Sequence, residues 1–137
     1  MSYSPGYQIK QLQEICDNGI ITNFSFSKNL YGTYTFKLSL TNQKIDGELT
    51  GIDFTKYKLN IVYKKSIEPY IYVTEPILVK RKHMHSDDRL CLYHKKEFKW
   101  SDKESIALKL IPWTIIWIYF YEMWLKTGIW YGDEYKH

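Results

Sequence analysis

The sequence predicts an α+β fold in which an N-terminal helix precedes a four-stranded antiparallel meander and C-terminal helices follow it. Three observations predict it: helical spacing of apolar residues at the start, alternation of apolar and polar residues through the middle, and a long aromatic segment near the end. Of the 137 residues, 45% are hydrophobic and 18% are aromatic. Such a chain can bury a core of its own, so we expect a single domain over residues 1–137.

The first predicted element is an amphipathic helix over residues 7–17. Its apolar residues recur at helical spacing: Ile9, Leu12, Ile15 and Cys16. The following Asn18-Gly19 is typical of a helix end. Because Cys16 lies on the apolar stripe, we expect a packed, inert thiol there.

The middle of the chain changes to a period of two, which is typical of half-buried strands. Strands are expected over residues 24–26, 34–40, 57–63 and 69–73, with a further short one over 45–52. Turn residues separate these segments, and Glu75-Pro76 closes the last of them. The spacing favours an antiparallel meander with one buried and one solvated face.

The last part of the chain predicts helices. Ser101-Asp102-Lys103-Glu104 has the residues of a capping box, so a helix is expected to start there. Pro112 cannot donate a helical hydrogen bond, so this helix should end or kink before it, and Pro112 should open a second helix over 113–126. Thr127-Gly128 is expected to end it. Because the second helix is aromatic nearly all round, the sheet, the tail or a partner must cover it.

Charge and composition argue against several function classes. The net charge is only +4 and the basic residues are spread out, which does not indicate a nucleic-acid partner. The most apolar run, residues 110–121, contains Pro112 and is shorter than the about 20 residues of a membrane span, so we expect a buried helix. Two cysteines in unrelated contexts, after an N-terminus without a signal-peptide pattern, predict a reducing, cytoplasmic location.

One loop, residues 83–93, holds most of the chemistry-bearing side chains. In it Cys91 lies between two leucines, where an apolar wall meets a polar rim. Histidines flank the thiol on both sides: His83, His85 and His94. A thiolate attacks activated carbonyls well, and Arg89 or one of these histidines could lower the pKa of Cys91 by favouring the thiolate. The first interpretation is therefore a nucleophilic cysteine.

Two other interpretations of this loop stay open on the residues alone. The pattern H-x-H-x5-C-x2-H supplies four possible zinc ligands. Alternatively, Leu90-Cys91-Leu92 is a strand in which the cysteine only packs. Alternation argues partly against the second of these, because Cys91 points outward if both leucines point inward.

The order of the predicted elements, with a histidine-bearing loop and Leu-Cys-Leu before the last helices, resembles the ubiquitin-conjugating (UBC-like) fold. A closer resemblance is to the prokaryotic branch of this family found in CBASS anti-phage operons. It covers about the last third of the chain and rests on these motifs: Leu90-Cys91-Leu92-Tyr93, Trp100-Ser101, Ile111-Pro112-Trp113, Tyr121-Glu122-x-Trp124-Leu125-x-Thr127-Gly128-x-Trp130-x-Gly132 and a terminal His137. The first two thirds match only in strand order and in the spacing of Tyr57, Tyr63 and Pro69.

This resemblance implies a cofactor-free transferase without a metal, in which Cys91 carries an activated C-terminal glycine carboxyl as a thioester and passes it to an amine, commonly a lysine. In CBASS systems the carried C-terminus is that of the cyclic-oligonucleotide synthase (CD-NTase), so the expected partners are this synthase and a lysine-bearing target. Whether an activating enzyme acts first stays open. The alternative is a non-catalytic partner-binding module on the same fold. Neither nucleic acid nor membrane is expected as a partner.

One departure from the family concerns the groups that stabilise the oxyanion, the negatively charged oxygen that forms when the thioester carbonyl is attacked. Eukaryotic members carry His-Pro-Asn before the cysteine, whereas this chain reads His83-Met84-His85, without the asparagine. Stabilising an oxyanion requires donors aimed at the developing charge. The candidates are His83, as the positional equivalent, His85, as an additional donor, and the backbone N–H groups of residues 88–91.

Two further groups have two interpretations each. Asp87 and Asp88 either orient an incoming lysine or form a solvated turn. Trp130 and Tyr131 either contact a partner or pack over the long helix.

Overall fold

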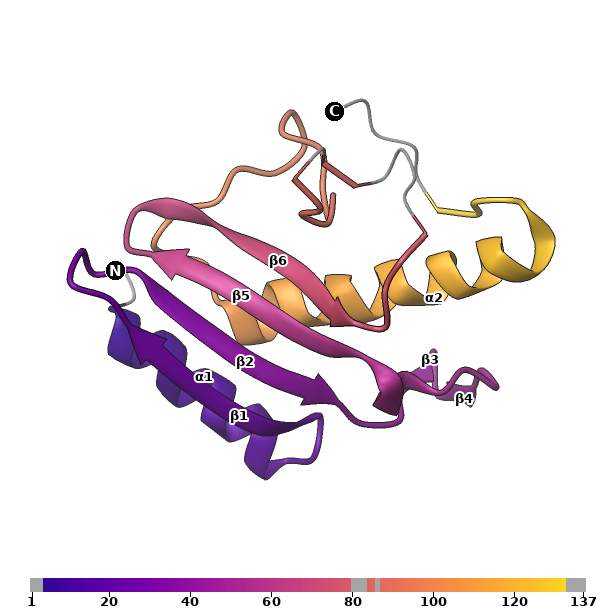
Figure 1. Ribbon diagram of the computed structural model, residues 1–137, viewed down its shortest axis with the longest axis horizontal. Helices are drawn as coiled ribbons and strands as arrows, with labels where there is room; N and C mark the ends of the chain where they lie inside the picture. Colours follow the sequence, from indigo (N-terminus) through magenta and orange to yellow (C-terminus); the bar gives the residue numbers. More distant parts are fainter. Residues whose placement is uncertain (1–3, 80–83, 86, 133–137) are drawn as a thin grey trace.

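The computed structural model describes residues 4–79, 84–85 and 87–132, and it has the predicted α+β architecture (Figure 1). An N-terminal helix, a four-stranded antiparallel sheet and a C-terminal helix are present, as expected. The elements in chain order are α1 (Pro5–Asp17), β1 (Ile21–Lys28), β2 (Tyr34–Leu40), β3 (Lys44–Ile45), β4 (Glu48–Leu49), the 3-10 helix η1 (Phe54–Lys56), β5 (Lys58–Lys64), β6 (Ile67–Glu75), the π-helix η2 (Ile106–Leu110) and α2 (Ile111–Thr127).

The main sheet has the strand order β1-β2-β5-β6 with every neighbouring pair antiparallel, which confirms the predicted meander. Its register aligns Phe26, Phe36, Ile61 and Ile71 across the four strands. Paired residues share a face of a sheet, so the apolar positions of all four strands converge on one side. The predicted alternation therefore has its expected consequence, one apolar face.

The expected single strand over residues 45–52 is wrong. The chain instead forms the small hairpin β3–β4, which projects beyond one end of the main sheet (Figure 1). Asp46 and Gly47, between the two strands, have φ angles of 52° and 79°. Positive φ at both central residues favours a two-residue hairpin turn, so the chain reverses where a longer strand was expected.

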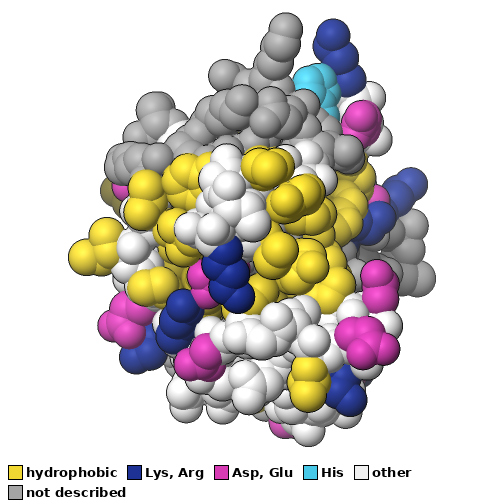
Figure 2. Space-filling view, turned by 90° about the vertical axis from the view of Figure 1, so that its right-hand side faces the viewer, with side chains coloured by type: hydrophobic (Ala, Val, Ile, Leu, Met, Phe, Trp, Pro, Cys, Tyr) yellow, Lys and Arg dark blue, Asp and Glu magenta, His cyan; other side chains and the backbone are white. Residues whose placement is uncertain are grey.

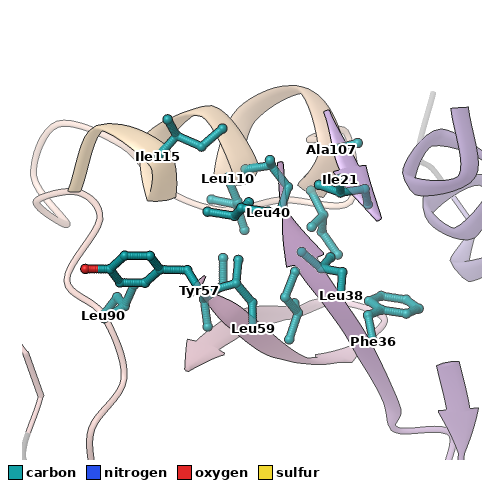
Figure 3. Packing of buried hydrophobic residues seen from close by; sticks show 14 of the residues in the cluster. Ile21, Phe36, Leu38, Leu40, Tyr57, Leu59, Leu90, Ala107, Leu110 and Ile115 are labelled. Carbon is teal, nitrogen blue, oxygen red and sulfur yellow. The ribbon is translucent and has the colours of Figure 1, made fainter. Parts of the chain in front are cut away.

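The core lies between the apolar face of the sheet and the helices. In Figure 3, Leu110 and Ile115 from the helical layer face Leu38, Leu40 and Leu59 from the sheet. Burying each such side chain stabilises the fold by about 1.5–3 kcal/mol. The result is a two-layer packing in which α2 crosses behind the sheet and α1 lies beside β1 (Figure 1).

Helix α1 has its predicted position, but its buried stripe includes two glutamines that the apolar pattern did not indicate. Gln8 and Gln11 are buried together with Leu12 and Ile15, while Cys16 packs partly buried against the core. Gln8 Nε2 donates to the Glu104 carbonyl at 2.8 Å, and its Oε1 accepts from the Ile106 N–H at 3.0 Å. These bonds join α1 to the start of the C-terminal helical segment.

Replacing Gln8 by alanine is expected to lower the free energy of unfolding by about 1–3 kcal/mol, because it removes the partner of the buried Ile106 N–H and of the half-buried Glu104 carbonyl. Chemical denaturation followed by tryptophan fluorescence measures this loss. Gln13 on the same helix is the matched control, since its bond to Asp17 is exposed and its replacement by alanine should change stability by about 0.5 kcal/mol or less. Equal losses at the two positions would contradict the assignment.

The C-terminal helical segment starts four residues later than the capping box predicted. Residues 101–104 form a turn that is tied to the β5–β6 connection, where Asp102 accepts hydrogen bonds from the Ser66 N–H and hydroxyl at 2.8 and 2.7 Å. Ser105 is the actual cap and accepts from the Leu108 N–H at 3.1 Å. The capping-box prediction is wrong: Ser105 caps the helical segment in place of Ser101, and the contact of Asp102 with Ser66 holds residues 101–104 in a turn.

Pro112 lies in the first turn of α2, as predicted. The segment before it does not end but forms the π-helix η2, in which the Ile111 N–H bonds the Ile106 carbonyl five residues back. A wider turn before the proline accommodates a ring that would clash with an ordinary α-helical turn.

Together η2 and α2 form a helical segment, Ile106–Thr127, that is long and apolar enough to cross a membrane by length and composition alone. In the protein, 56% of its most apolar window is buried. We therefore interpret it as the core helix that the sequence predicted.

The chain reverses after α2 and packs its tail on the helix. Gly128 ends α2 in the left-handed conformation with φ of 75°, which confirms the predicted end. The ring centroid of Trp130 then lies 5.6 Å from that of Trp117 and 5.9 Å from that of Phe120. A Cβ atom on Gly132 would lie 2.6 Å from the Phe120 ring, so only glycine permits this close approach. For Trp130, packing over the long helix is confirmed.

Candidate active site

The loop that carries Cys91 is attached to the edge strand β6. The Leu90 N–H donates to the Ile71 carbonyl at 3.0 Å, which places the following residue beside the sheet. Two bonds close the preceding turn: His85 N–H to the Arg89 carbonyl at 2.8 Å, and Asp88 N–H to the His85 carbonyl at 3.0 Å. The loop backbone is thus determined by its own hydrogen bonds and by the sheet edge.

The side chain of Arg89 also attaches the loop to β6. Its Nε donates to Asp87 Oδ1 at 2.9 Å, and its guanidinium lies 4.1 Å from the ring centroid of Tyr70 on β6. The bond to Arg89 lowers the pKa of the Asp87 carboxyl below its ordinary value. Of the two interpretations of Asp87, these contacts favour the turn, because its carboxylate holds Arg89.

Cys91 is 5% exposed, and Leu90 before it is buried as well. Of the third interpretation, in which Leu90-Cys91-Leu92 is a strand whose cysteine only packs, the packing agrees with this burial, but the strand is wrong. Leu90 makes a single β-bridge with Met84, and the chain leaves the sheet edge directly after it. Without further strand pairing, the period-two constraint ends and both side chains turn inward.

Burial raises the pKa of the Cys91 thiol to about 12, and Arg89 only partly offsets this effect. The net pKa of Cys91 therefore lies above its ordinary value, although a cation stands beside it. Arg89 acts in the expected direction, but loss of water around the thiolate is the larger effect. At neutral pH the resting protein holds Cys91 as a protonated thiol.

The rate of Cys91 alkylation by iodoacetamide is expected to rise about tenfold per pH unit from pH 7 to 10, because only the thiolate reacts and its fraction grows below the pKa. An ordinary thiol, with a pKa of about 8.5, levels off within this range. Quenched-time-point mass spectrometry of the peptide containing Cys91 measures the profile. A plateau below pH 9 would contradict the raised pKa.

His85 lies half-buried near the thiol, and burial, followed by the charge of Arg89, lowers its pKa below the ordinary value. Its imidazole is thus neutral at neutral pH and can accept a proton. His85 and Cys91 both line a small hollow, which we call the polar hollow after its ionisable side chains. Its other walls are the polar or charged Glu68, Tyr70, Arg89, Tyr93 and Lys95 and the apolar Pro69, Ile71, Leu90, Leu92 and Leu110. The hollow has room of about 30 Å³, on the order of one water molecule.

His94, which the structure describes, is not among the residues that line this hollow. His83 lies outside the described residues. His94 turns to the backbone after the loop, where its Nδ1 accepts from the Lys96 N–H at 3.1 Å. Among residues 4–79, 84–85 and 87–132, no group of three or more His, Cys, Asp or Glu side chains is arranged to hold a metal ion.

Three of the backbone N–H groups expected to stabilise an oxyanion are engaged within the loop. Those of Asp88 and Leu90 donate to carbonyls, and that of Arg89 donates to Asp87 Oδ1 at 3.3 Å. The His85 side chain lines a hollow together with the thiol.

On its other side Cys91 borders a pocket of about 400 Å³. Aromatic rings from three parts of the chain form most of its walls: Tyr93 and Phe98 from the segment after the cysteine, Trp113, Trp117 and Phe120 from α2, and Trp130 from the tail. Phe98 and Trp113 meet edge to face with centroids 5.0 Å apart, and Tyr93 lies 4.8 Å from Phe98. Cys91 therefore forms a wall shared by a polar hollow and an aromatic pocket.

The sequence did not predict this pocket, although part of its signal was visible. Trp113, Trp117 and Phe120 recur at helical spacing on one side of α2. The spacing does not indicate that Trp130 returns over the helix or where Phe98 lies, and these two side chains complete the walls of the pocket.

The family model for the type II CBASS E2 protein matches residues 17–137 of the chain, which include Cys91, α2 and the aromatic tail. The chain belongs to this family. No curated protein matches it.

Membership in the type II CBASS E2 family confirms the resemblance drawn from the motifs after residue 90 and the expected UBC-like fold. The arrangement of α1, the four-stranded meander and α2 agrees with that fold. The family name assigns the protein an E2-like role and implies a protein partner within the CBASS system.

Proposed function

We propose that this type II CBASS E2 protein carries the C-terminal glycine of a CD-NTase as a thioester on Cys91 and passes it to an amine. The observation that supports this most is the position of Cys91, in a wall shared by a polar hollow with His85 and an aromatic pocket of about 400 Å³. A thiol there has a proton acceptor on one side and room for a substrate on the other. The reaction needs neither metal nor cofactor, and we place it in the cytoplasm.

The donor carboxyl must arrive activated, as a thioester or an acyl adenylate made by a separate reaction. In loading, the Cys91 sulfur attacks the activated carbonyl, a carbon–sulfur bond forms, and the activating group leaves with its electron pair. Neutral His85 accepts the thiol proton, and as a donor it then faces the carbonyl oxygen of the thioester. Because burial keeps the resting thiol protonated, Cys91 reacts with a bound donor in preference to small electrophiles.

Loading can be tested with a synthetic peptide thioester that has the last residues of the CD-NTase and ends in glycine. Intact mass spectrometry of the wild type should show one added peptide, which dithiothreitol removes. Cys16→Ala is the matched control, since it removes the other thiol and should load like the wild type. Loading that persists in Cys91→Ala, or that is lost in Cys16→Ala, would contradict the proposal.

A second candidate is a non-catalytic partner-binding module, and the burial of Cys91 favours it. Exposed apolar side chains are available for a partner, among them Leu49, Ile77, Leu125 and Ile129. Hydrophobic side chains gather on the side of the molecule where α2 and the β3–β4 hairpin end (Figure 2). In this case Cys91→Ala should protect cells from phage as well as the wild type does, an outcome that the carrier function excludes.

A further inference from the structure

The two sides of Cys91 differ in charge. The polar hollow carries the cationic Arg89 and Lys95 beside one carboxylate, Glu68. Of the described residues that line the aromatic pocket, Glu97 is the one with a formal charge, and it is exposed at the rim. Asp87 pairs with Arg89 and Glu68 offsets Lys95, so the first side offers N–H donors that suit a carbonyl oxygen, whereas the Glu97 carboxylate suits a cation on the second side.

The aromatic walls strengthen this preference. The faces of tryptophan and phenylalanine rings carry negative potential and attract ammonium groups within about 6 Å of the centroid. The protein already shows this at two rings of the pocket, because Lys109 Nζ lies 5.2 Å from the centroid of Phe98 and 5.8 Å from that of Trp113. Rings in this cluster are thus positioned to accept an alkylammonium.

We propose that the aromatic pocket binds the acceptor amine, a primary alkylammonium such as a lysine side chain, with its methylenes on the indole faces and its nitrogen near Glu97. The pocket volume of about 400 Å³ falls within the roughly 300–1,000 Å³ of small-ligand sites. Because Cys91 forms part of the wall, the amine bound there is next to the thioester. This inference rests on the proposed thioester function of Cys91.

The transfer step balances with these groups. The bound ammonium first releases one proton to the Glu97 carboxylate, which returns it to solvent. The amine nitrogen then attacks the thioester carbonyl, a carbon–nitrogen bond forms and the carbon–sulfur bond breaks. The departing sulfur takes a second proton from the nitrogen, and the products are an amide and the free Cys91 thiol.

Discharge of preloaded protein tests the assignment. Wild type and variants are loaded with the peptide thioester, and Nα-acetyl-lysine amide or hydroxylamine is then added. Glu97→Gln, which keeps the shape but removes the charge of an exposed residue, should slow discharge to the lysine amide by about tenfold. Trp113→Leu should act likewise by removing a ring face. Discharge to the small, uncharged hydroxylamine should slow much less than discharge to the lysine amide. Glu14→Gln, at an exposed position on α1 outside the site, is the matched surface control and should load and discharge like the wild type.

A second experiment measures amine binding directly, so that its result does not depend on whether Cys91 forms a thioester. Pentylammonium is titrated into unloaded wild type while the tryptophan indole N–H resonances are followed by NMR, and pentanol is the neutral probe. Pentylammonium should shift indole resonances at concentrations where pentanol does not, even if no peptide loads. Equal shifts with both probes, or lysine discharge that is unchanged in Glu97→Gln and Trp113→Leu, would overturn the inference in favour of a pocket for apolar groups of the donor.

Discussion

Replacing Cys91 by serine is expected to convert a transient thioester into a stable ester that dithiothreitol does not remove. The hydroxyl oxygen occupies nearly the same position between the polar hollow and the aromatic pocket, so His85 can still accept its proton. The resulting ester resists amines because an alkoxide is a much poorer leaving group than a thiolate. Transfer to amines should fall below detection.

Cys91→Ala is the paired variant, because it has no nucleophilic atom and should show no adduct in any condition. Non-reducing and reducing gels, followed by intact mass spectrometry, distinguish the three outcomes. The wild-type adduct disappears with reductant, the serine adduct persists, and the alanine variant has none. A serine variant that still conjugates an amine at the wild-type rate would show that the sulfur is not the carrier.

Phe36→Ala is expected to lower the free energy of unfolding by about 3–5 kcal/mol. Phe36 is 0% exposed, aligns with Ile61 in the middle of the sheet, and stacks on Tyr63 with centroids 6.1 Å apart. Removing its ring leaves a cavity against α-helix and sheet neighbours that cannot close. Since a domain of this size is stable by about 5–15 kcal/mol, the loss is a large part of the total.

The matched control is Phe26→Ala, since Phe26 aligns with Phe36 on the edge strand β1 but is 50% exposed. Its replacement should cost about 1 kcal/mol. Urea denaturation of both variants measures the difference in the free energy of unfolding. Similar losses in the two variants would contradict a core that is centred on Phe36 and leaves Phe26 at its edge.

The contrast between these two phenylalanines shows how far periodicity predicts the fold. Both occur in strands with the same alternation, and the sequence correctly predicts that they share a face. Their burial differs because the chain's helices cover the central strands more fully than the edge, and periodicity holds no information on which strand becomes the edge.

The misplaced elements have a common physical cause, since local signals compete with tertiary contacts. Asp102 lies inside the capping motif Ser101-Asp102-Lys103-Glu104, yet it accepts two hydrogen bonds from Ser66 in the folded protein, which hold this segment as a turn. Gln8 looks like a solvent-facing residue of an amphipathic helix, yet both ends of its amide satisfy buried backbone groups. Such partners lie more than thirty positions away in the chain, beyond any local pattern.

At the candidate site the sequence identified the residue but not its surroundings. Cys91 and His85 could be selected by residue type and resemblance, and both line the same hollow. The sequence left the burial of the thiol undecided, because the packing interpretation placed Cys91 inside whereas strand alternation pointed it toward solvent. The aromatic pocket requires α2 and the tail to meet beside the loop, which only the fold brings about.

A buried, protonated thiol has a consequence for the proposed reaction. It protects Cys91 from oxidation and from casual acylation while no donor is present. Reactivity then depends on the donor bringing an activated carbonyl next to His85, and the choice of donor becomes a matter of binding at the loop and not of thiol reactivity alone.

The most direct test of this account is peptide mapping of the wild-type chain purified from cells that also express the CD-NTase, with mass spectrometry before and after reduction. The account predicts the CD-NTase C-terminal glycine joined to the peptide that contains Cys91, and its release by dithiothreitol. An adduct on Cys16 or on a lysine of this chain, or the bare chain mass in every preparation, would contradict it.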